Sequence, residues 1–133
     1  MNLQVGVKIL IRNKSDKYLF IKRKKLLQNE TEQSWDIPGG RIKPGETLMK
    51  ALQREVNEEI NVTLTGEPRL INAQDIFVPT KKFHVVRLTY MIDLDIDSVK
   101  LSDAHGELMW ATLPNTSSFN IEPFLKETLD KIS

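Results

Sequence analysis

Three glutamates crowd into little more than one turn of a predicted helix, and this crowding restricts what the chain can fold into. The segment from Gly40 to Val62 reads GRIKPGETLMKALQREVNEEINV and holds Glu55, Glu58 and Glu59. An α-helix advances about 100° per residue, so Glu55 and Glu59 lie on nearly the same line along its surface. The apolar residues around that line are Leu48, Ala51, Leu52 and Val56. The helix is therefore expected to bury two carboxylates together with its apolar side.

Two buried like charges need a counter-ion. Without one, burial would protonate the carboxylates or unfold the helix. A hard divalent cation suits oxygen ligands and leaves coordination positions open for water and phosphate oxygens. An acidic run such as Glu58-Glu59 is, by itself, typical of a solvated helix face. The apolar neighbours of Glu55 and Glu59 favour a metal site over that interpretation.

The flanking residues predict where this helix begins and ends. A Pro-Gly-Gly sequence at 38–40 precedes a short extended piece, and Pro44-Gly45 follows as a turn. Thr47 is a suitable N-cap residue. Asn61 tolerates the left-handed conformation that closes many helices. The sequence therefore predicts a helix between Thr47 and Asn61, directly after a glycine-rich turn.

The segment resembles the Nudix box. The family pattern is Gly, five residues, Glu, seven residues, Arg-Glu, an aliphatic residue, any residue, Glu-Glu, any residue, Gly and an aliphatic residue. The positions that match it in register are Gly40, Glu46, Arg54, Glu55, Val56, Glu58, Glu59 and Val62. Asn61 stands where the family has its last glycine. Because asparagine adopts positive φ more readily than most residues, the loop is expected to keep its shape.

The resemblance implies a fold, a reaction and a metal. The fold is α/β, a mixed β-sheet sandwiched between α-helices. The reaction is hydrolysis of a nucleoside diphosphate linked to another group, with Mg²⁺ or Mn²⁺ as cofactor. Arg54 is similar to the family arginine that pairs with neighbouring glutamates, and is expected to assist catalysis. The implied metal ligands are the carbonyl of Gly40 and the carboxylates of Glu55, Glu58 and Glu59.

Hydrolysis also needs a group that takes the proton from the attacking water. A pyrophosphate repels hydroxide, so catalysis depends mainly on charge neutralisation and positioning. Glu58 is one candidate for the general base. Glu107 is the other, because it precedes Leu108-Met109-Trp110, which resembles an acid-then-tryptophan segment late in the family's chains. The alternative for Glu107 is a solvated turn carboxylate.

Three further residues are candidates for substrate binding. Arg23 ends the second predicted strand and Arg41 follows the glycines, positions where some Nudix members direct cations at phosphates. Both are also compatible with ordinary solvated surface charge. Asn120, in Asn-Ile-Glu-Pro, resembles an asparagine of MutT-type enzymes whose amide recognises a purine base. Its alternative is the N-cap of the last helix, and the two roles are compatible.

Length and composition agree with a single small enzyme. The chain has 133 residues, which predicts one domain over 1–133 with a substantial core. The net charge of +1 does not indicate a nucleic acid or an acidic membrane as partner. No cysteine is present, which excludes disulfides and thiolate metal sites. With no apolar stretch long enough for a bilayer, a cytoplasmic protein is expected, as monomer or homodimer.

Periodicity predicts the remaining elements. Apolar and polar residues alternate from Val5 to Ile11, a turn follows at 13–16, and Tyr18 to Lys22 is expected to pair back as a hairpin. Two β-rich stretches cover 69–77 and 83–94, and a late strand covers 108–110. An amphipathic helix is expected from Ile121 to Ile132.

The sequence thus favours a Mg²⁺-dependent, MutT-like Nudix hydrolase that cleaves a nucleoside triphosphate or a related nucleotide between phosphates. Within enzymes, the alternative is a pyrophosphatase of ADP-ribose, of a nucleotide sugar or of a dinucleoside polyphosphate. A non-catalytic Nudix module that binds a nucleotide or RNA is the alternative from another class. Such modules usually lose glutamates of the box, and this chain retains all three.

Overall fold

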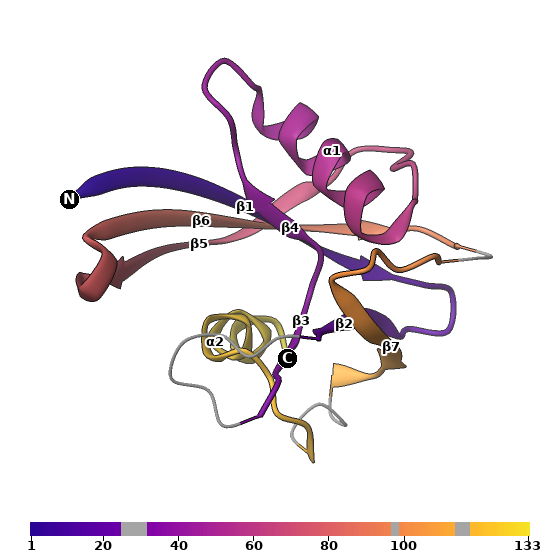
Figure 1. Ribbon diagram of the computed structural model, residues 1–133. Helices are drawn as coiled ribbons and strands as arrows, with labels where there is room; N and C mark the ends of the chain where they lie inside the picture. The colour runs from indigo at the N-terminus through magenta and orange to yellow at the C-terminus, as the bar shows by residue number, and fades with distance from the viewer. Residues whose placement is uncertain (25–31, 97–98, 114–117) are drawn as a thin grey trace.

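The structure is a computed structural model in which residues 1–24, 32–96, 99–113 and 118–133 are described. Figure 1 shows a sheet with one helix on each face. In chain order the elements are β1 (Asn2–Arg12), β2 (Tyr18–Arg23), β3 (Trp35–Asp36), β4 (Gly39–Arg41), α1 (Leu48–Ile60), β5 (Arg69–Val78), the 3₁₀ helix η1 (Pro79–Lys81), β6 (Phe83–Asp93), β7 (His105–Ala111) and α2 (Pro123–Ile132).

The sheet is mixed, as the sequence predicts. Within the described ranges its strand order is β3-β2-β1-β6-β5, with β4 paired to β1 and β7 paired to β2. β1 and β6 run parallel in an unbroken register from Asn2 opposite Phe83 to Arg12 opposite Asp93. The other pairs are antiparallel. β1 is longer than the predicted 5–11 because β6 pairs with it along its whole length.

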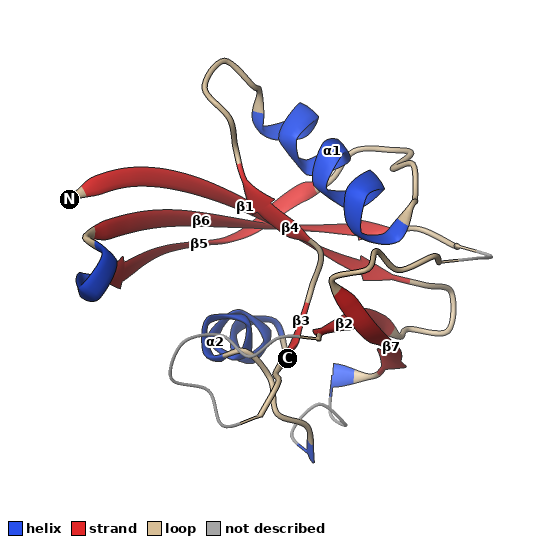
Figure 2. Ribbon diagram, viewed as in Figure 1, coloured by secondary structure: helices blue, strands red, loops and turns tan. Residues whose placement is uncertain are grey.

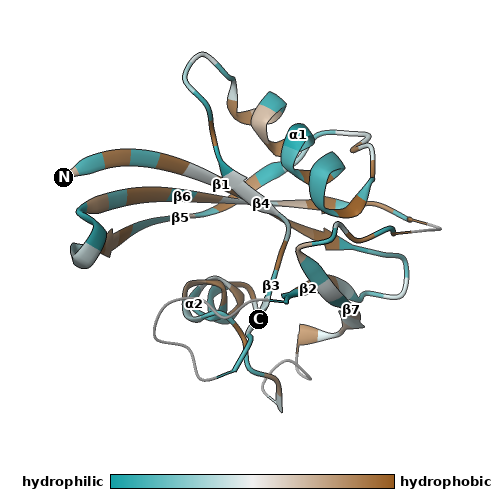
Figure 3. Ribbon diagram, in the orientation of Figure 1, coloured by the Kyte–Doolittle hydropathy of each residue, from teal (hydrophilic) through white to brown (hydrophobic). Residues whose placement is uncertain are grey.

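The alternation of side chains along β1 supplies a core on each face of the sheet. Val7, Ile9 and Ile11 join the cluster that packs against α1. Leu10 faces the other way, into the cluster that packs against α2. Successive residues of a strand point to opposite faces, so one strand serves both cores. Figure 2 shows the helices on the two sides of the strands, and Figure 3 shows hydrophobic and hydrophilic residues alternating along β1.

The ends of α1 are those the sequence predicts. Thr47 Oγ1 accepts a hydrogen bond from the amide of Lys50 at 3.2 Å, as an N-cap does. Asn61 adopts φ 56° and ψ 43°, the left-handed conformation, and its amide donates to the carbonyl of Asn57. Between these caps the helix buries Ala51, Leu52, Val56 and Ile60.

The second helix begins later than expected. Its N-cap is Glu122, whose carboxylate accepts hydrogen bonds from the amides of Phe124 and Leu125. The alternative reading of Asn120 as the N-cap is therefore wrong, because Pro123 occupies the first helical position, where its missing N–H costs nothing. Neither α1 nor α2 has both the length and the hydropathy of a bilayer span, and the same holds throughout the described residues.

Candidate active site

The glycine turn before α1 packs directly against two of the predicted metal ligands. Gly39 has a φ of 147°, and a Cβ there would lie 2.0 Å from the carbonyl oxygen of Val7, so only glycine fits. The amide of Gly39 donates to Glu59 Oε2 at 3.1 Å. At Gly40, a Cβ would lie 2.6 Å from the carboxylate of Glu55. The turn thus leaves space for both carboxylates.

Arg54 connects α1 to the loop and the strand that precede it. Its Nε and Nη2 donate to the two carboxylate oxygens of Glu46 at 2.7 and 2.9 Å. Nη1 donates to Glu55 Oε1 at 2.8 Å and lies 3.5 Å from Glu58 Oε2. Nη2 also donates to the carbonyl of Arg41 at 3.1 Å. A planar guanidinium suits this two-pronged bond to a carboxylate, and it fixes the rotamers of the acids around it.

These contacts have opposite effects on two carboxyl groups. The hydrogen bonds from Arg54 lower the pKa of Glu46 to about 2, so this group stays ionised. Burial raises the pKa of Glu59 to about 7, against the opposing effects of the charge on Lys8 and the hydrogen bond from Gly39. The nearby charges of Glu55 and Asp36 add to the rise. Glu59 is therefore a half-buried acid that lacks sufficient positive charge around it.

A cavity of about 390 Å³ opens beside the glycine turn and is lined by cations. Its lining includes Gly39 and Gly40 from the turn, and Ile76, Val78 and Val85 from β5 and β6. None of the described residues that line it is acidic. The charged residues of the lining are Lys8, Arg23, Arg41 and Arg87. These four cations attract an anion to the cavity.

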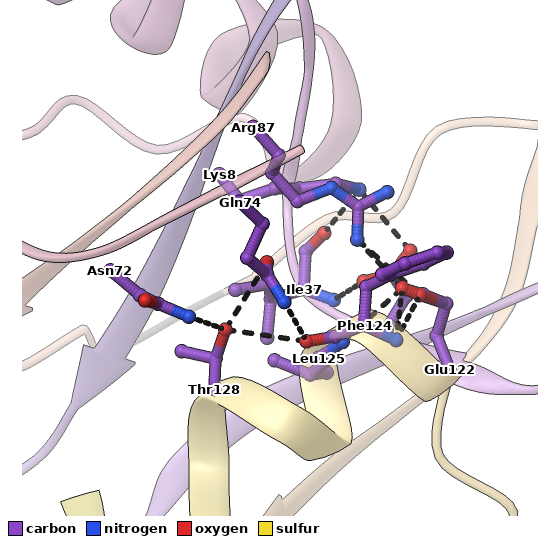
Figure 4. A network of polar contacts seen from close by, with 10 residues as sticks. Lys8, Ile37, Asn72, Gln74, Arg87, Glu122, Phe124, Leu125 and Thr128 are labelled. Atoms are coloured by element: carbon purple, nitrogen blue, oxygen red, sulfur yellow. Dashed lines mark hydrogen bonds and ion pairs between the residues drawn. The ribbon is translucent and has the colours of Figure 1, made fainter. Parts of the chain in front are cut away.

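Two of these cations are paired with carboxylates that do not line the cavity (Figure 4). Lys8 Nζ lies 3.2 Å from Asp36 Oδ2 and 3.2 Å from the carbonyl oxygen of Ile37. Arg87 Nη1 lies 2.6 Å from Glu122 Oε1. Arg23 and Arg41 form no ion pair with a carboxylate among the described residues. Arg41 instead lies over the ring of Phe83, 5.0 Å from its centre.

Comparison with known proteins identifies the chain. A family model described as NUDIX domain matches residues 2–131. The chain belongs to the Nudix family. The family match, together with relatives named as nucleotide phosphatases, confirms the predicted family and the predicted class of hydrolase acting on phosphoric anhydride bonds. The Nudix family binds small nucleotide substrates and generally uses divalent metal ions.

Individual relatives support this assignment. The low-salt glycan biosynthesis protein Agl8 of Haloferax volcanii is 26% identical over 134 residues, covering 96% of this chain and 81% of that protein. The human 8-oxo-dGDP phosphatase NUDT18 is 47% identical over 58 residues, which is 44% of this chain but 17% of that protein. The MutT Nudix hydrolase of Burkholderia pseudomallei superposes with a TM-score of 0.83 at 22% identity and full coverage of both chains. The predicted Nudix fold is thereby confirmed.

The three glutamates of the Nudix box do not lie equally close to the turn. Glu55 and Glu59 face Gly39 and Gly40. The side chain of Glu58 is 56% exposed and lies toward Arg54. In the described ranges no three acidic or histidine side chains already converge closely enough to hold an ion. The structure thus brings together two of the three predicted carboxylate ligands.

The oxygen chemistry of the Nudix box nevertheless fits a divalent cation. Glu59 has a raised pKa because its charge is incompletely compensated, and a cation beside it would remove that cost. A Cβ at Gly40 would collide with Glu55, so the glycine lets this carboxylate lie directly against the turn. Glu58 needs only a change of rotamer to approach the other two, because it is exposed.

Two predicted residues lie away from the Nudix box. Glu107 is on β7, 63% exposed, with its Oε2 3.9 Å from the Nζ of Lys22 on the neighbouring strand. Asn120 is exposed, and its Nδ2 donates to the carbonyl oxygen of Gln33 at 3.2 Å. Neither residue lines the cavity beside the turn. Arg23 and Arg41 do line it, as expected of phosphate-binding residues.

Sequence reasoning missed four charged residues of this region, namely Lys8, Asp36, Arg87 and Glu122. Lys8 interrupts the apolar run VGVKILI, and Arg87 interrupts VVRLTYMI. A charged residue inside an otherwise buried strand is a signal that could have been followed. The partners could not be found in this way, because 28 residues separate Lys8 from Asp36 and 35 separate Arg87 from Glu122.

Proposed function

We propose that this chain is a Mg²⁺- or Mn²⁺-dependent pyrophosphohydrolase of MutT-like type. It cleaves a nucleoside triphosphate, or a related nucleoside diphosphate derivative, by attack of water on a phosphorus. The observation that carries this proposal is the cation-lined cavity that adjoins the glutamates of the Nudix box across the Gly39–Gly40 turn. A chain of phosphates can lie between these two sets of charges.

Each side chain has a proposed role. Glu55, Glu58 and Glu59, with the carbonyl of Gly40, would hold the metal. When bound, such an ion neutralises phosphate charge and lowers the pKa of a bound water. Arg54 positions the glutamates through its bonds to Glu46 and Glu55.

The general base is proposed to be Glu58. It is exposed to water and adjoins the other two carboxylates in the chain, whereas Glu107 lies on β7, outside the Nudix box. Glu107 stays the alternative. Arg23 and Arg41 are proposed to bind phosphate oxygens, since neither is neutralised by a carboxylate among the described residues. Asn120 is retained as a proposed contact to the base, beyond the cavity itself.

A nucleotide sugar is the second candidate substrate. The relative that matches along 96% of this chain is named for glycan biosynthesis. The other relative reported above is named for an 8-oxo-dGDP phosphatase, but it matches over 44% of the chain. The longer match is a specific reason to include nucleotide sugars, ADP-ribose and dinucleoside polyphosphates in the test.

The test is chromatographic separation of the products formed from a panel of these compounds, with and without Mg²⁺ or Mn²⁺: a nucleotide with phosphate or pyrophosphate from a triphosphate, and two phosphate esters from each of the other compounds. Turnover is expected with the metal, and removal of the metal by a chelator should abolish it. The Glu55→Gln variant is the control for contaminating hydrolases and should lose activity by at least about a hundredfold. Binding of nucleotides without turnover of any of them would identify a non-catalytic module instead.

A further inference from the structure

Two buried ion pairs border the cavity, and the proposed hydrolysis uses neither. Lys8 on β1 pairs with Asp36, and their side chains are 9% and 8% exposed. Arg87 on β6 pairs with Glu122, and their side chains are 19% and 7% exposed. Figure 4 shows the two pairs in one network between the sheet and the start of α2.

Stability alone does not account for these pairs. Removing two charges from water costs about as much as their attraction returns, so replacing a buried ion pair by apolar residues is often neutral or stabilising. Leu10, the next residue of β1 on the same face as Lys8, is apolar and fully buried. The position of the pairs at the cavity is therefore the feature to explain.

The pairs are oriented with their cations toward the cavity. Lys8 and Arg87 line it, whereas Asp36 and Glu122 do not. The two carboxylates are occupied within the protein, because Asp36 Oδ1 accepts from the amide of Ile37 and Glu122 caps α2. The positive charges of Lys8 and Arg87 are thus compensated by carboxylates that do not line the cavity.

Hydrogen-bond donors remain on these two cations. Lys8 Nζ has three N–H groups, and its bonds to Asp36 and Ile37 use two of them. Arg87 uses Nη1 for Glu122, and in the described part of the chain its Nε and Nη2 have no hydrogen-bond partner. Both residues can therefore donate to a ligand, and neither can accept.

The four cations of the cavity differ in their net charge. Arg23 and Arg41 flank the glycine turn without a carboxylate partner in the described ranges, which suits an anionic phosphate. Lys8 and Arg87 are each compensated by a carboxylate, which suits a neutral group rich in acceptors. The cavity thus has two kinds of cation, two suited to phosphate and two suited to a neutral acceptor.

We infer that Lys8 and Arg87 are specificity-determining residues that recognise the base of the nucleotide and favour a 6-keto purine over adenine. This inference rests on the proposed function, because it takes the ligand to be a nucleotide. A 6-keto purine presents O6 and N7 as adjacent acceptors, and lysine and arginine are the residues that pair with them. Adenine presents an amino donor in place of O6, which two donor-only side chains cannot satisfy.

The first measurement compares inosine with adenosine nucleotides. The ratio of kcat/KM for inosine triphosphate over adenosine triphosphate is expected to be about tenfold or more. The 7-deaza analogue of guanosine triphosphate lacks the N7 acceptor, and its kcat/KM should fall severalfold below that of guanosine triphosphate. Calorimetric binding of inosine and adenosine monophosphates measures the same preference without hydrolysis.

The variants remove each pair as a unit, so that no buried charge is left alone. In Lys8→Met/Asp36→Asn and in Arg87→Met/Glu122→Gln the inosine-to-adenosine ratio should fall to about two or less. The glutamine keeps an acceptor for the N-terminus of α2. Arg12→Met/Asp93→Asn is the control, because this pair likewise joins a basic residue of β1 to an acidic residue of another element but lies outside the cavity. The control should keep the wild-type ratio.

A further variant distinguishes the proposed phosphate-binding cations from the proposed base-binding cations. Arg23→Gln should raise KM for both nucleotides by a similar factor and leave their ratio unchanged. A paired variant that instead loses affinity for both nucleotides equally would show that Lys8 and Arg87 bind phosphate or a second charged group, and would overturn the inference. An unchanged ratio in both paired variants would overturn it as well.

Failure of the inference differs from failure of the proposed function. Hydrolysis of inosine and adenosine triphosphates at equal rates would overturn the inference and support the function. Selective binding of inosine monophosphate by a protein that hydrolyses no nucleotide would overturn the function and support base recognition by Lys8 and Arg87.

Discussion

At Glu59, burial and charge oppose each other, and the fold keeps this conflict in place. The carboxylate accepts the amide of Gly39 and lies near the charge of Lys8, yet its pKa is raised to about 7. Ionisation of a glutamate on an exposed helix face would carry no such desolvation cost. A group that resists ionisation without a cation, and ionises with one, links metal binding to pH and to stability.

The metal-free protein is therefore expected to lose stability as the pH rises. In the folded state Glu59 keeps its proton up to about pH 7, whereas in the unfolded state it releases the proton near its ordinary pKa of 4.5. The unfolded state binds fewer protons between these values, so its free energy falls relative to the folded state across this window. The Glu59→Gln variant should exceed the stability of the wild type by about 3 kcal/mol at pH 8 and by nothing at pH 4.

Thermal unfolding in chelator at several pH values checks this expectation. Added Mg²⁺ should raise the Tm of the wild type at pH 8 and should leave the variant nearly unchanged, since the ligand is lost. A variant that is less stable than the wild type at pH 8 in chelator would contradict the assignment of Glu59.

Gly40 is expected to tolerate no side chain, because of its close approach to Glu55. A Cβ would stand 2.6 Å from the carboxylate of Glu55, which must move away from the turn. Gly40→Ala should reduce kcat/KM by about 10- to 100-fold with little loss of secondary structure, because displacement of a catalytic group by about 1 Å has this effect. Gly106→Ala on β7 is the control, since its nearest neighbour is the flexible Lys24 at 3.3 Å. Equal activity of the two variants would argue against a role for Glu55.

At the scale of elements, α1 was predictable because its signals are local. Thr47, the apolar stripe and Asn61 all lie within the helix or next to it, and the structure has them as caps and core. The start of α2 was not predictable in this way. Its cap is Glu122 because Arg87, on a strand 35 residues earlier, holds that carboxylate in place.

Asn61 should be sensitive to alanine and nearly indifferent to glycine. Its φ is 56°, which penalises a Cβ, and its Nδ2 donates to the carbonyl oxygen of Lys100 at 2.8 Å. Asn61→Ala keeps the Cβ and loses the bond, so it should destabilise the protein by about 2 kcal/mol. Asn61→Gly loses the bond but relieves the backbone, so its cost should stay below about 1 kcal/mol. Urea denaturation measures both, and equal costs would show that the side-chain bond dominates.

At the scale of the molecule, two cores share one sheet. Trp110 packs against the cluster beneath α1, and Trp35 packs against the cluster beneath α2. Because β1 contributes to both, neither core can open without disturbing the other. The variants Trp35→Phe and Trp110→Phe leave one fluorescent reporter on each face.

When the same destabilising substitution is added to both single-tryptophan variants, their Tm values should stay equal to each other. Leu129→Ala, beneath α2, should lower stability by about 2–4 kcal/mol and shift both reporters to the same extent. Leu52→Ala, beneath α1, should act in the same way. A substitution that shifts one reporter alone would show that the two cores unfold independently.

The sequence predicted the mixed sheet through the Nudix resemblance, and it predicted the strands through their alternation. The metal site stays a prediction. The sequence did not predict the cavity, because Lys8, Arg23, Arg41 and Arg87 come from four strands whose order only the tertiary structure shows. The solvated alternative for Glu107 agrees with its exposure, but its place on a strand and its pairing with Lys22 depend on the register of β7 against β2. Local patterns predict elements, whereas sites assembled from several elements need the topology.

The parallel pairing of β1 with β6 also bears on how the chain is made. The two partners are 81 residues apart at Arg12 and Asp93. On the ribosome, β1 emerges before β6 and stays without this partner until the intervening residues have been synthesised. A nascent chain that stalls before β6 would expose an apolar strand edge, so we expect premature termination products to depend on chaperones or to aggregate.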